Sequence, residues 1–467
     1  MEVQCCALGS GGATATYITI DNVYGAIDPV RISGRSRKGI RDTDADRRHP
    51  VVAAASRGRQ PQPLPDPRGL EDRPMVIGRS RGWKEYTAII LLWQVTASVC
   101  FYAIYAVTPF VRDDFGVSAT SVGVLLTTLT LGYTLCLLPI GRVIDAYGER
   151  LVLVVGLLGL GVGSVGVTVA PSYVALLVAV FVLGAFYATA MPGTNIAVFN
   201  AIPHERLNTA MGIKQVGVTA GSGISAIAIP WFGATRFGWE VGFLLATACA
   251  GVVSVVFWLV YDAEGERGDG DSVAIRDHLE TPGYVLVLLA GFLLASGLFT
   301  TTGYTILYVD EAVGATVVFA GITLAGAQVS GSVGRIVVGW LADRLSTPLR
   351  TSAPVILCFQ AGASFVLFLS VTLVDSRLTA FALFAALGFF VLGWPGIYYS
   401  YIGSLVPSEG IGSATAGGQI ALNCGALVTP PVFGYLVDVR SYAAAWIVLA
   451  LAALASTVLF GVLSRRT

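Results

Sequence analysis

The sequence GRVIDAYGER at residues 141–150 is a short polar stretch between two long apolar runs. A related sequence, GWLADR, occurs at residues 339–344, and the two stretches align at a spacing of 198 residues. This spacing is a little under half of the 467-residue chain. A charged, glycine-containing stretch that recurs at this interval in an otherwise apolar chain predicts a duplicated membrane protein.

The composition agrees with this prediction. The chain is 55% apolar and only 12% charged, with a mean hydropathy of +0.73, whereas soluble domains carry about twice that charged fraction. The sequence has no basic stripe with interleaved aromatic residues, so nucleic-acid binding is not indicated. The seven cysteines and three histidines show no metal-ligand spacing, and no nucleotide loop or catalytic triad is found. We therefore expect neither an enzyme nor a protein with a metal or cofactor.

Beyond residue 85 the chain contains twelve apolar runs, each close to the roughly 20 residues that a membrane-spanning helix needs. Each run must be helical, because backbone polar groups cannot stay unpaired in lipid. The fold class is therefore all-α. The expected spans are 86–110, 117–140, 150–170, 173–198, 208–233, 239–260, 283–308, 315–341, 351–373, 378–402, 411–436 and 442–464.

An internal repeat divides these runs six and six. At the offset of 198, Tyr86 matches Tyr284 and Gly123 matches Gly321, and further matches follow at an offset of 204. Two repeats with an even number of spans keep the same membrane topology. The expected domains are a disordered leader at 1–80, a first six-helix bundle at 81–262, a linker at 263–282 and a second bundle at 283–467.

Two further expectations concern the leader and the orientation. Residues 1–74 either belong to the native protein or precede a natural start at Met75, and the sequence leaves both open. Twelve basic residues lie in the connections on the side of the N-terminus and four on the other side. Because basic loops stay inside, we expect both termini to be cytoplasmic and the protein to lie in the cytoplasmic (inner) cell membrane.

The paired stretches resemble the signature loop of the major facilitator superfamily, which joins the second and third helices and is echoed between the eighth and ninth. The resemblance covers about residues 80–467. It implies two pseudo-symmetric six-helix bundles that work by alternating access, with Asp145 latching the halves together in the outward-open state. The family usually has a basic residue directly after this aspartate, where the chain has Ala146. The expected latch residues are Gly141, Asp145, Gly148, Arg150, Gly339, Asp343 and Arg344. The alternative is a loop that only fixes topology.

Two cations lie deep inside apolar runs. Lys214 is about 10 Å into the fifth run and Arg335 about 12 Å into the eighth, counted at 1.5 Å per residue. Such charges are costly in lipid unless they snorkel, line water or meet an anion. The sequence around Lys214 is similar to that of many prokaryotic anion and small-molecule porters. Arg335 matches an arginine that contacts the anion in monocarboxylate and nitrate porters. Snorkelling or helix pairing for Lys214, and a structural role for Arg335, remain the alternatives.

Other polar residues fall on the helices that line the cavity in this family. Each of them can equally be a helix-packing contact. Proline–glycine pairs after Met191 and Trp394 predict interruptions of the fourth and tenth runs near a midplane site. The candidate substrate contacts beside Lys214 and Arg335 are Gln215, Gln419, Asn423, Tyr105, Tyr304 and Tyr398.

The sequence thus predicts a secondary transporter for a small organic anion such as a monocarboxylate. Its partners would be the substrate, a co-transported proton or cation, and the lipid bilayer, and we expect a monomer. No Asp or Glu falls in the middle of a run, so no residue stands out as a proton carrier. The alternatives are a drug exporter, although Ser222 replaces the proline that such exporters carry after the glycine at Gly221, and a non-transporting membrane receptor. Direction, substrate and coupling ion are left open.

Overall fold

The computed structural model describes residues 82–263, 275–345, 347–407 and 410–466. The predicted leader and most of the predicted 263–282 linker lie outside the described residues. Within the described ranges every regular element is a helix, and twelve stretches are long and apolar enough to cross a membrane. The all-α fold class and the number of spans are confirmed.

The helices follow the predicted runs closely. Two spans consist of two helices each, namely α5 with α6 and α12 with α13. The helices are α1 (Trp83–Ala106), α2 (Thr108–Phe115), α3 (Ala119–Tyr147), α4 (Glu149–Thr168), α5 (Tyr173–Tyr187), α6 (Ala190–Ala201), α7 (Leu207–Gly233), α8 (Glu240–Val260), α9 (Tyr284–Glu311), α10 (Val317–Arg344), α11 (Leu349–Val371), α12 (Arg377–Val391), α13 (Pro395–Leu405), α14 (Ile411–Val439) and α15 (Tyr442–Arg466), with short 3₁₀ turns η2 (His204–Arg206) and η3 (Ile275–His278).

The polar stretch 141–150 is mostly helical, so the expectation of a loop was wrong. Helix α3 continues to Tyr147, and only Gly148, with φ 81°, separates it from α4. Such a φ favours glycine, which has no Cβ to clash. Residues 339–344 form the last turns of α10. Both helices therefore continue through the polar residues beyond the apolar segment. Their hydrogen bonds keep the backbone paired up to the point where the chain leaves the lipid.

The predicted interruptions of the fourth and tenth spans are confirmed, but they lie before the prolines. Helix α5 ends at Tyr187 and α12 at Val391. Pro192 and Pro395 have no N–H, so the carbonyl groups of Ala188 and Val391, four residues earlier, lose their helical donor. The helix is therefore weakest one turn upstream of each proline.

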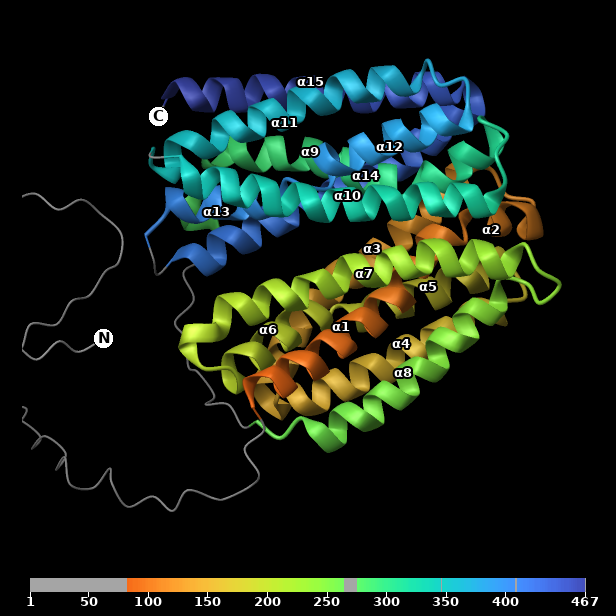
Figure 1. Cartoon of the computed structure of the whole chain (residues 1–467), viewed down its shortest axis with the longest axis horizontal. Coiled ribbons are helices and arrows are strands. Elements are labelled where there is room, and N and C mark those ends of the chain that lie inside the picture. Colours follow the sequence, from red (N-terminus) through yellow and green to blue (C-terminus); the bar gives the residue numbers. More distant parts are fainter. Residues whose placement is uncertain (1–81, 264–274, 346, 408–409, 467) are drawn as a thin grey trace, which may run out of the picture. The chain divides into compact units, whose positions relative to one another are not determined.

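The spans form two halves, the N half (α1–α8) and the C half (α9–α15), which Figure 1 shows side by side. The halves meet where α3 packs on α14 and α7 packs on α10. A Cβ on Gly123 would lie 2.4 Å from the Pro430 carbonyl oxygen, and one on Gly321 would lie 2.2 Å from that of Ala226. Because Gly123 and Gly321 correspond in the repeat, both contacts follow the same pseudo-symmetry.

Candidate functional site

The halves are joined at one end of the spans, which we call the capped end. Asp438, near the end of α14, accepts hydrogen bonds from the backbone N–H groups of Ala119 (2.9 Å) and Thr120 (2.8 Å) and from the Thr120 hydroxyl (2.6 Å). Asp438 thereby caps the N-terminus of α3, where helices leave N–H groups unpaired and favour a negative charge. A residue of one half thus completes a helix of the other.

Three further contacts cross between the halves toward this end. Arg112 of α2 forms an ion pair with Glu311 of α9 at 2.7 Å. The Thr127 hydroxyl donates to the Leu427 carbonyl oxygen at 2.6 Å. Tyr304 donates to the carbonyl oxygens of Ala119 (2.8 Å) and Pro430 (2.9 Å). Tyr304 was predicted as a substrate contact, and the structure places its buried hydroxyl between these two carbonyls.

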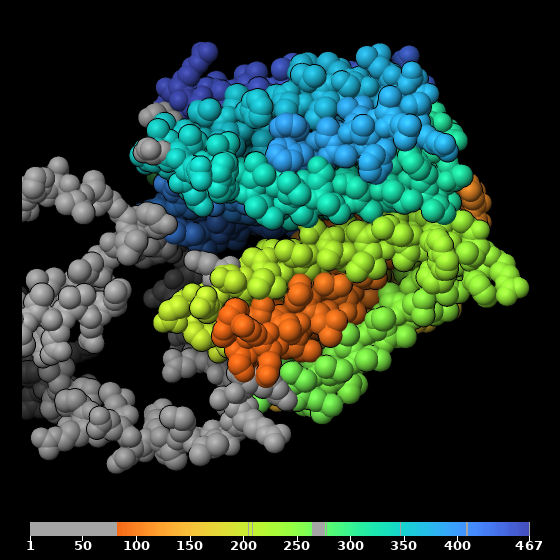
Figure 2. All heavy atoms as spheres, in the orientation of Figure 1, coloured from red at the N-terminus to blue at the C-terminus, as the bar shows by residue number. Residues whose placement is uncertain are grey.

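The opposite end, which carries residues 141–150 and 339–344, is the signature end. Asp145 and Asp343 are exposed there, and within the described ranges neither forms a hydrogen bond or ion pair. A Cβ on Gly141 or Gly339 would meet open space. No hydrogen bond between described residues joins the halves here, and Figure 2 shows a gap between them at this end. The predicted latch residues Asp145 and Asp343 therefore do not join the halves through any bond among the described residues.

Two basic residues of the signature end, Arg150 and Arg344, contact tryptophans of their own half. The Arg150 guanidinium lies 4.4 Å from the Trp258 ring centroid and also donates to the Trp258 carbonyl oxygen. Arg344 lies 4.5 Å from the ring centroid of Trp340. Cation–π contacts of this kind hold the arginines against the bundle surface.

Lys214, in α7, is fully buried. Its Nζ donates to Asn195 Oδ1 of α6 at 2.5 Å and lies 4.0 Å from the sulfur of Met191. The side chain therefore does not snorkel to either surface, and Asn195 is half-buried beside it. The adjacent Gln215 is exposed, with no hydrogen bond to a described side chain.

A chain of polar side chains starts next to Asn195 and runs through the N half. The Thr194 hydroxyl donates to Gln94 Oε1 (3.3 Å), the Gln94 amide donates to Ser98 (3.2 Å), and Ser98 bonds with the Tyr187 hydroxyl (3.2 Å). All four residues are buried. Hydrogen-bonded networks of this kind fix side-chain positions in an apolar bundle.

Tyr187 belongs to an aromatic cluster on α1, α3 and α5. Its ring stacks on Phe101 at 4.0 Å, and Tyr102 lies edge-on to it at 6.4 Å. Tyr105 and Tyr133 complete the cluster, with ring centroids 6.1 and 6.4 Å from Phe101. The predicted contact Tyr105 is buried inside this cluster, whereas Tyr102 and Tyr133 are half-buried.

Arg335 lies on α10, in the C half. Its Nε donates to the Leu392 carbonyl oxygen at 2.9 Å, at the break between α12 and α13. Within the described part of the chain, the two Nη groups have no hydrogen-bond acceptor and the side chain is half-buried. The Tyr102 phenol of the N half lies close enough to Arg335 for a charge on one to act on the other. The guanidinium is thus fixed at Nε, and its two Nη groups remain as donors.

A second polar group of the C half lies on α13 and α14. The Tyr399 hydroxyl donates to Gln419 Oε1 at 2.5 Å, and the Gln419 amide donates to Asn423 Oδ1 at 2.9 Å. The buried Asn423 Nδ2 and the Tyr398 hydroxyl have no partner among the described residues. The sequence places Tyr399 among the polar residues of the cavity-lining helices, although not among the candidate substrate contacts. Its position one residue after Tyr398 in an interrupted span was the available signal.

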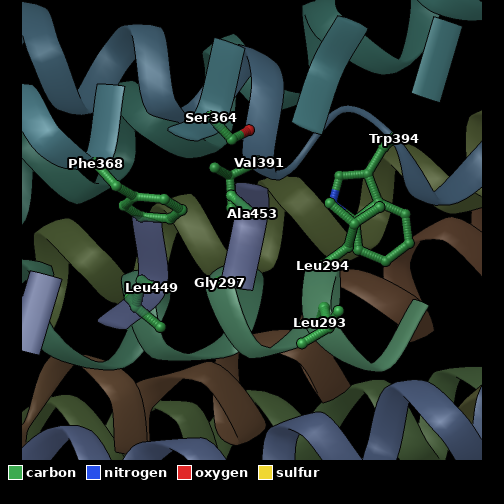
Figure 3. A pocket seen from close by; sticks show the side chains of 9 residues that line it. All are labelled: Leu293, Leu294, Gly297, Ser364, Phe368, Val391, Trp394, Leu449 and Ala453. Carbon is green, nitrogen blue, oxygen red and sulfur yellow. The ribbon is translucent and has the colours of Figure 1, made fainter. Parts of the chain in front are cut away.

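A small cavity lies inside the C half, between α9, α11, α12 and α15 (Figure 3). No charged side chain lines it. Because it is enclosed by apolar residues of one bundle, it does not fit an anion. The lining residues are Leu293, Leu294, Gly297, Ser364, Phe368, Val391, Trp394, Leu449 and Ala453.

Comparison with known proteins assigns the class. Residues 90–416 match the Major Facilitator Superfamily, so the chain belongs to this family of membrane transporters. It is 24% identical to the hexuronate transporter of Bacillus subtilis (strain 168), over 75% of this chain and 87% of that protein. It is 23% identical to the D-galactonate transporter of Escherichia coli O6:H1 (strain CFT073), over 80% of this chain and 94% of that protein.

The fold is similar to that of solved transporters. A bacterial homologue of the human lysosomal transporter Spinster, in an inward-facing and occupied conformation, matches with a TM-score of 0.68 and 16% identity. The match covers 83% of this chain and 98% of that structure. The predicted family and fold are therefore confirmed.

Proposed function

We propose that this transporter carries a small organic anion, with a single carboxylate bound by Arg335. The observation that carries the proposal is the guanidinium geometry, in which Nε is fixed by Leu392 and the two Nη groups remain available. A guanidinium with two parallel donors suits a carboxylate. The relatives named for hexuronate and D-galactonate support a substrate that combines a carboxylate with several hydroxyl groups.

The C half offers partners for such hydroxyl groups. Asn423 has an unused Nδ2 donor, and Tyr398 has an unpaired hydroxyl. Tyr102 and Tyr133 provide half-buried aromatic rings on the N-half side. Buried polar groups without partners cost free energy, which a hydroxylated ligand would recover. Gln419 and Asn423 therefore remain proposed substrate contacts, whereas Tyr304, whose hydroxyl is already bonded, is proposed to hold the capped end closed.

The transport cycle would alternate between two conformations. If the signature end is cytoplasmic, as the basic residues predict, the described conformation is open to the cytoplasm. Asp145, Arg150, Asp343, Arg344 and the three glycines would then close the signature end in the opposite state. Both termini would be cytoplasmic, in the inner cell membrane, and each half would move as one body.

The test uses purified protein in proteoliposomes with radiolabelled D-galactonate, a hexuronate and the cationic drug puromycin. Wild type is expected to take up one or both anions. Arg335→Ala should abolish this uptake, and Arg335→Lys should lower it at least tenfold, because an ammonium cannot form the paired bonds of a guanidinium. The exposed Arg236 provides the control, and Arg236→Gln should transport normally.

Two results would overturn the proposal. One is undiminished anion uptake by a folded Arg335→Ala variant. The other is a wild-type protein that moves puromycin and no anion, which would make the chain a drug exporter.

A further inference from the structure

We propose that Lys214 is the proton-binding residue of the transport cycle. Its amine would take up a proton when an anion occupies the Arg335 site and release it when the anion leaves. This inference rests on the proposed function, since it needs an anionic substrate. The sequence predicts that Lys214 and Arg335 both bind the anion. In this proposal Arg335 binds the anion and Lys214 binds the proton.

The surroundings of Lys214 support a role apart from direct contact with the substrate. The ammonium is fully buried, and Asn195 Oδ1 at 2.5 Å is its one oxygen acceptor among the described residues. No carboxylate of the described chain lies within ion-pair distance of its Nζ. A buried ammonium with a neutral partner is weakly compensated, so a negative charge that arrives nearby stabilises its protonated form.

The elements packed on α7 bring few other charges to this region. They are α1, α6, α8, α10 and η2, and α6 has no charged residue. The charged and titratable side chains of the others are Lys84, Glu85, Tyr86, Cys100, Tyr102 and Tyr105 on α1, His204, Glu205 and Arg206 on η2, Glu240, Cys249 and, next to its end, Tyr261 on α8, and Arg335, Asp343 and Arg344 on α10. The closest described contacts of the Lys214 ammonium are with α6 and not with any of these.

Hydrogen bonds, one step along the chain and ring contacts lead from the lysine region toward the arginine region. Asn195, which binds Lys214, follows Thr194 in α6, and Thr194 begins the hydrogen-bonded chain to Tyr187. The Tyr187 ring contacts that of Tyr102, and Tyr102 lies close enough to Arg335 for a charge on one to act on the other. The two cations therefore belong to one polar system that spans both halves. A charge that binds at Arg335 can influence Lys214 through it.

Coupling of this kind is reciprocal. If a bound anion increases the proton affinity of Lys214, a bound proton increases the affinity for the anion by the same factor. One singly charged anion and one proton would then cross together, and their charges cancel. Transport should respond to a pH gradient and be indifferent to the membrane potential.

The first experiment measures proton binding directly. Calorimetric titration of the detergent-purified protein with D-galactonate, repeated in buffers of different ionisation enthalpy, gives the number of protons taken up per bound anion. We expect about one for wild type and for the exposed control Lys84→Gln. We expect none for Lys214→Arg, whose side chain stays charged throughout. Asn195→Asp should also take up no proton, because the new carboxylate beside Lys214 keeps its amine protonated with or without the anion. This variant replaces Lys214→Arg in the experiment if Lys214→Arg does not fold.

The second experiment measures transport in proteoliposomes. Galactonate uptake by wild type should increase with a proton gradient and not change with a potassium-diffusion potential. Any uptake by Lys214→Arg should lose its response to the proton gradient and respond to the potential, because the anion would then move alone. A purely structural lysine would change the rate and leave both responses as in wild type.

The outcomes separate the two proposals. Anion binding by wild type without proton uptake, or with equal uptake in Lys214→Arg, would overturn the role of Lys214 and leave the anion assignment intact. Failure of wild type to bind either D-galactonate or a hexuronate would overturn the proposed function, and this inference with it.

Discussion

The capped end and the signature end are opposite ends of the same helices, yet among the described residues hydrogen bonds and an ion pair join the two halves only toward the capped end. At the capped end Asp438 satisfies two backbone N–H groups and a hydroxyl of the other half, and Arg112 pairs with Glu311. At the signature end Asp145 and Asp343 are exposed and form no bond with a described residue. The charged residues at the two ends of the spans therefore differ in whether they have partners.

The duplication relates the two halves at the same end of the spans, so it does not by itself decide which end is closed. The glycine contacts of α3 with α14 and of α7 with α10 correspond in the repeat. The aspartate contact does not, because the counterpart of Asp438 at the offset of 204 is Ala234, which has no carboxylate. The N-cap side chains of the two helices, Ser118 of α3 and Thr316 of α10, do correspond. We infer that glycines allow the halves to approach and that aspartate contacts decide which end stays closed.

The largest expected effect comes from filling the close contact at Gly123. Gly123→Leu would force side-chain atoms into the Pro430 backbone, which cannot turn aside as a side chain can. The capped end should open, and transport should be lost, because one of the two conformations becomes inaccessible. Gly223→Leu on α7 is the matched control, since a Cβ there meets no atom within 4 Å. Normal transport by Gly123→Leu would mean that the glycine contact does not govern closure.

A smaller effect is expected from removing the cap. Asp438→Ala should weaken the capped end by about 1 kcal/mol, the usual contribution of an aspartate N-cap, which is a several-fold change in the conformational equilibrium. Thr316→Ala removes a cap that lies within α10 and does not cross between the halves. Accessibility of a cysteine label to an impermeant reagent at the capped end should rise in the first variant and stay unchanged in the second. Equal accessibility in both would assign Asp438 a local role.

Much of the fold could be predicted from the sequence. Membrane helices are long and must be continuous, so twelve apolar runs and a repeat define the architecture. The helical nature of residues 141–147 could not be predicted in this way. Polar residues at the end of a span look like a loop in a hydropathy pattern, and a single glycine marks the actual break.

Less of the candidate site could be predicted. Lys214 and Arg335 stood out because charges in an apolar run are rare, but their partners Asn195 and Leu392 depend on helix packing. Asp438 was missed. Its partners Ala119 and Thr120 lie more than 300 residues away in the chain. Aspartates are common at the ends of membrane spans, so nothing in the sequence distinguishes Asp438 from the others.

The claim that opposite aspartates hold opposite ends can be tested with spin-label distances. In a cysteine-depleted protein, one label pair at positions 236 and 373 reports on the capped end, and another at 199 and 411 reports on the signature end. Asp438→Ala should lengthen the first distance and shorten the second. Asp145→Asn should shorten the first distance and lengthen the second, because it favours the described conformation. Distances that stay as in wild type in both variants, or that shift in the same direction in both, would contradict the account.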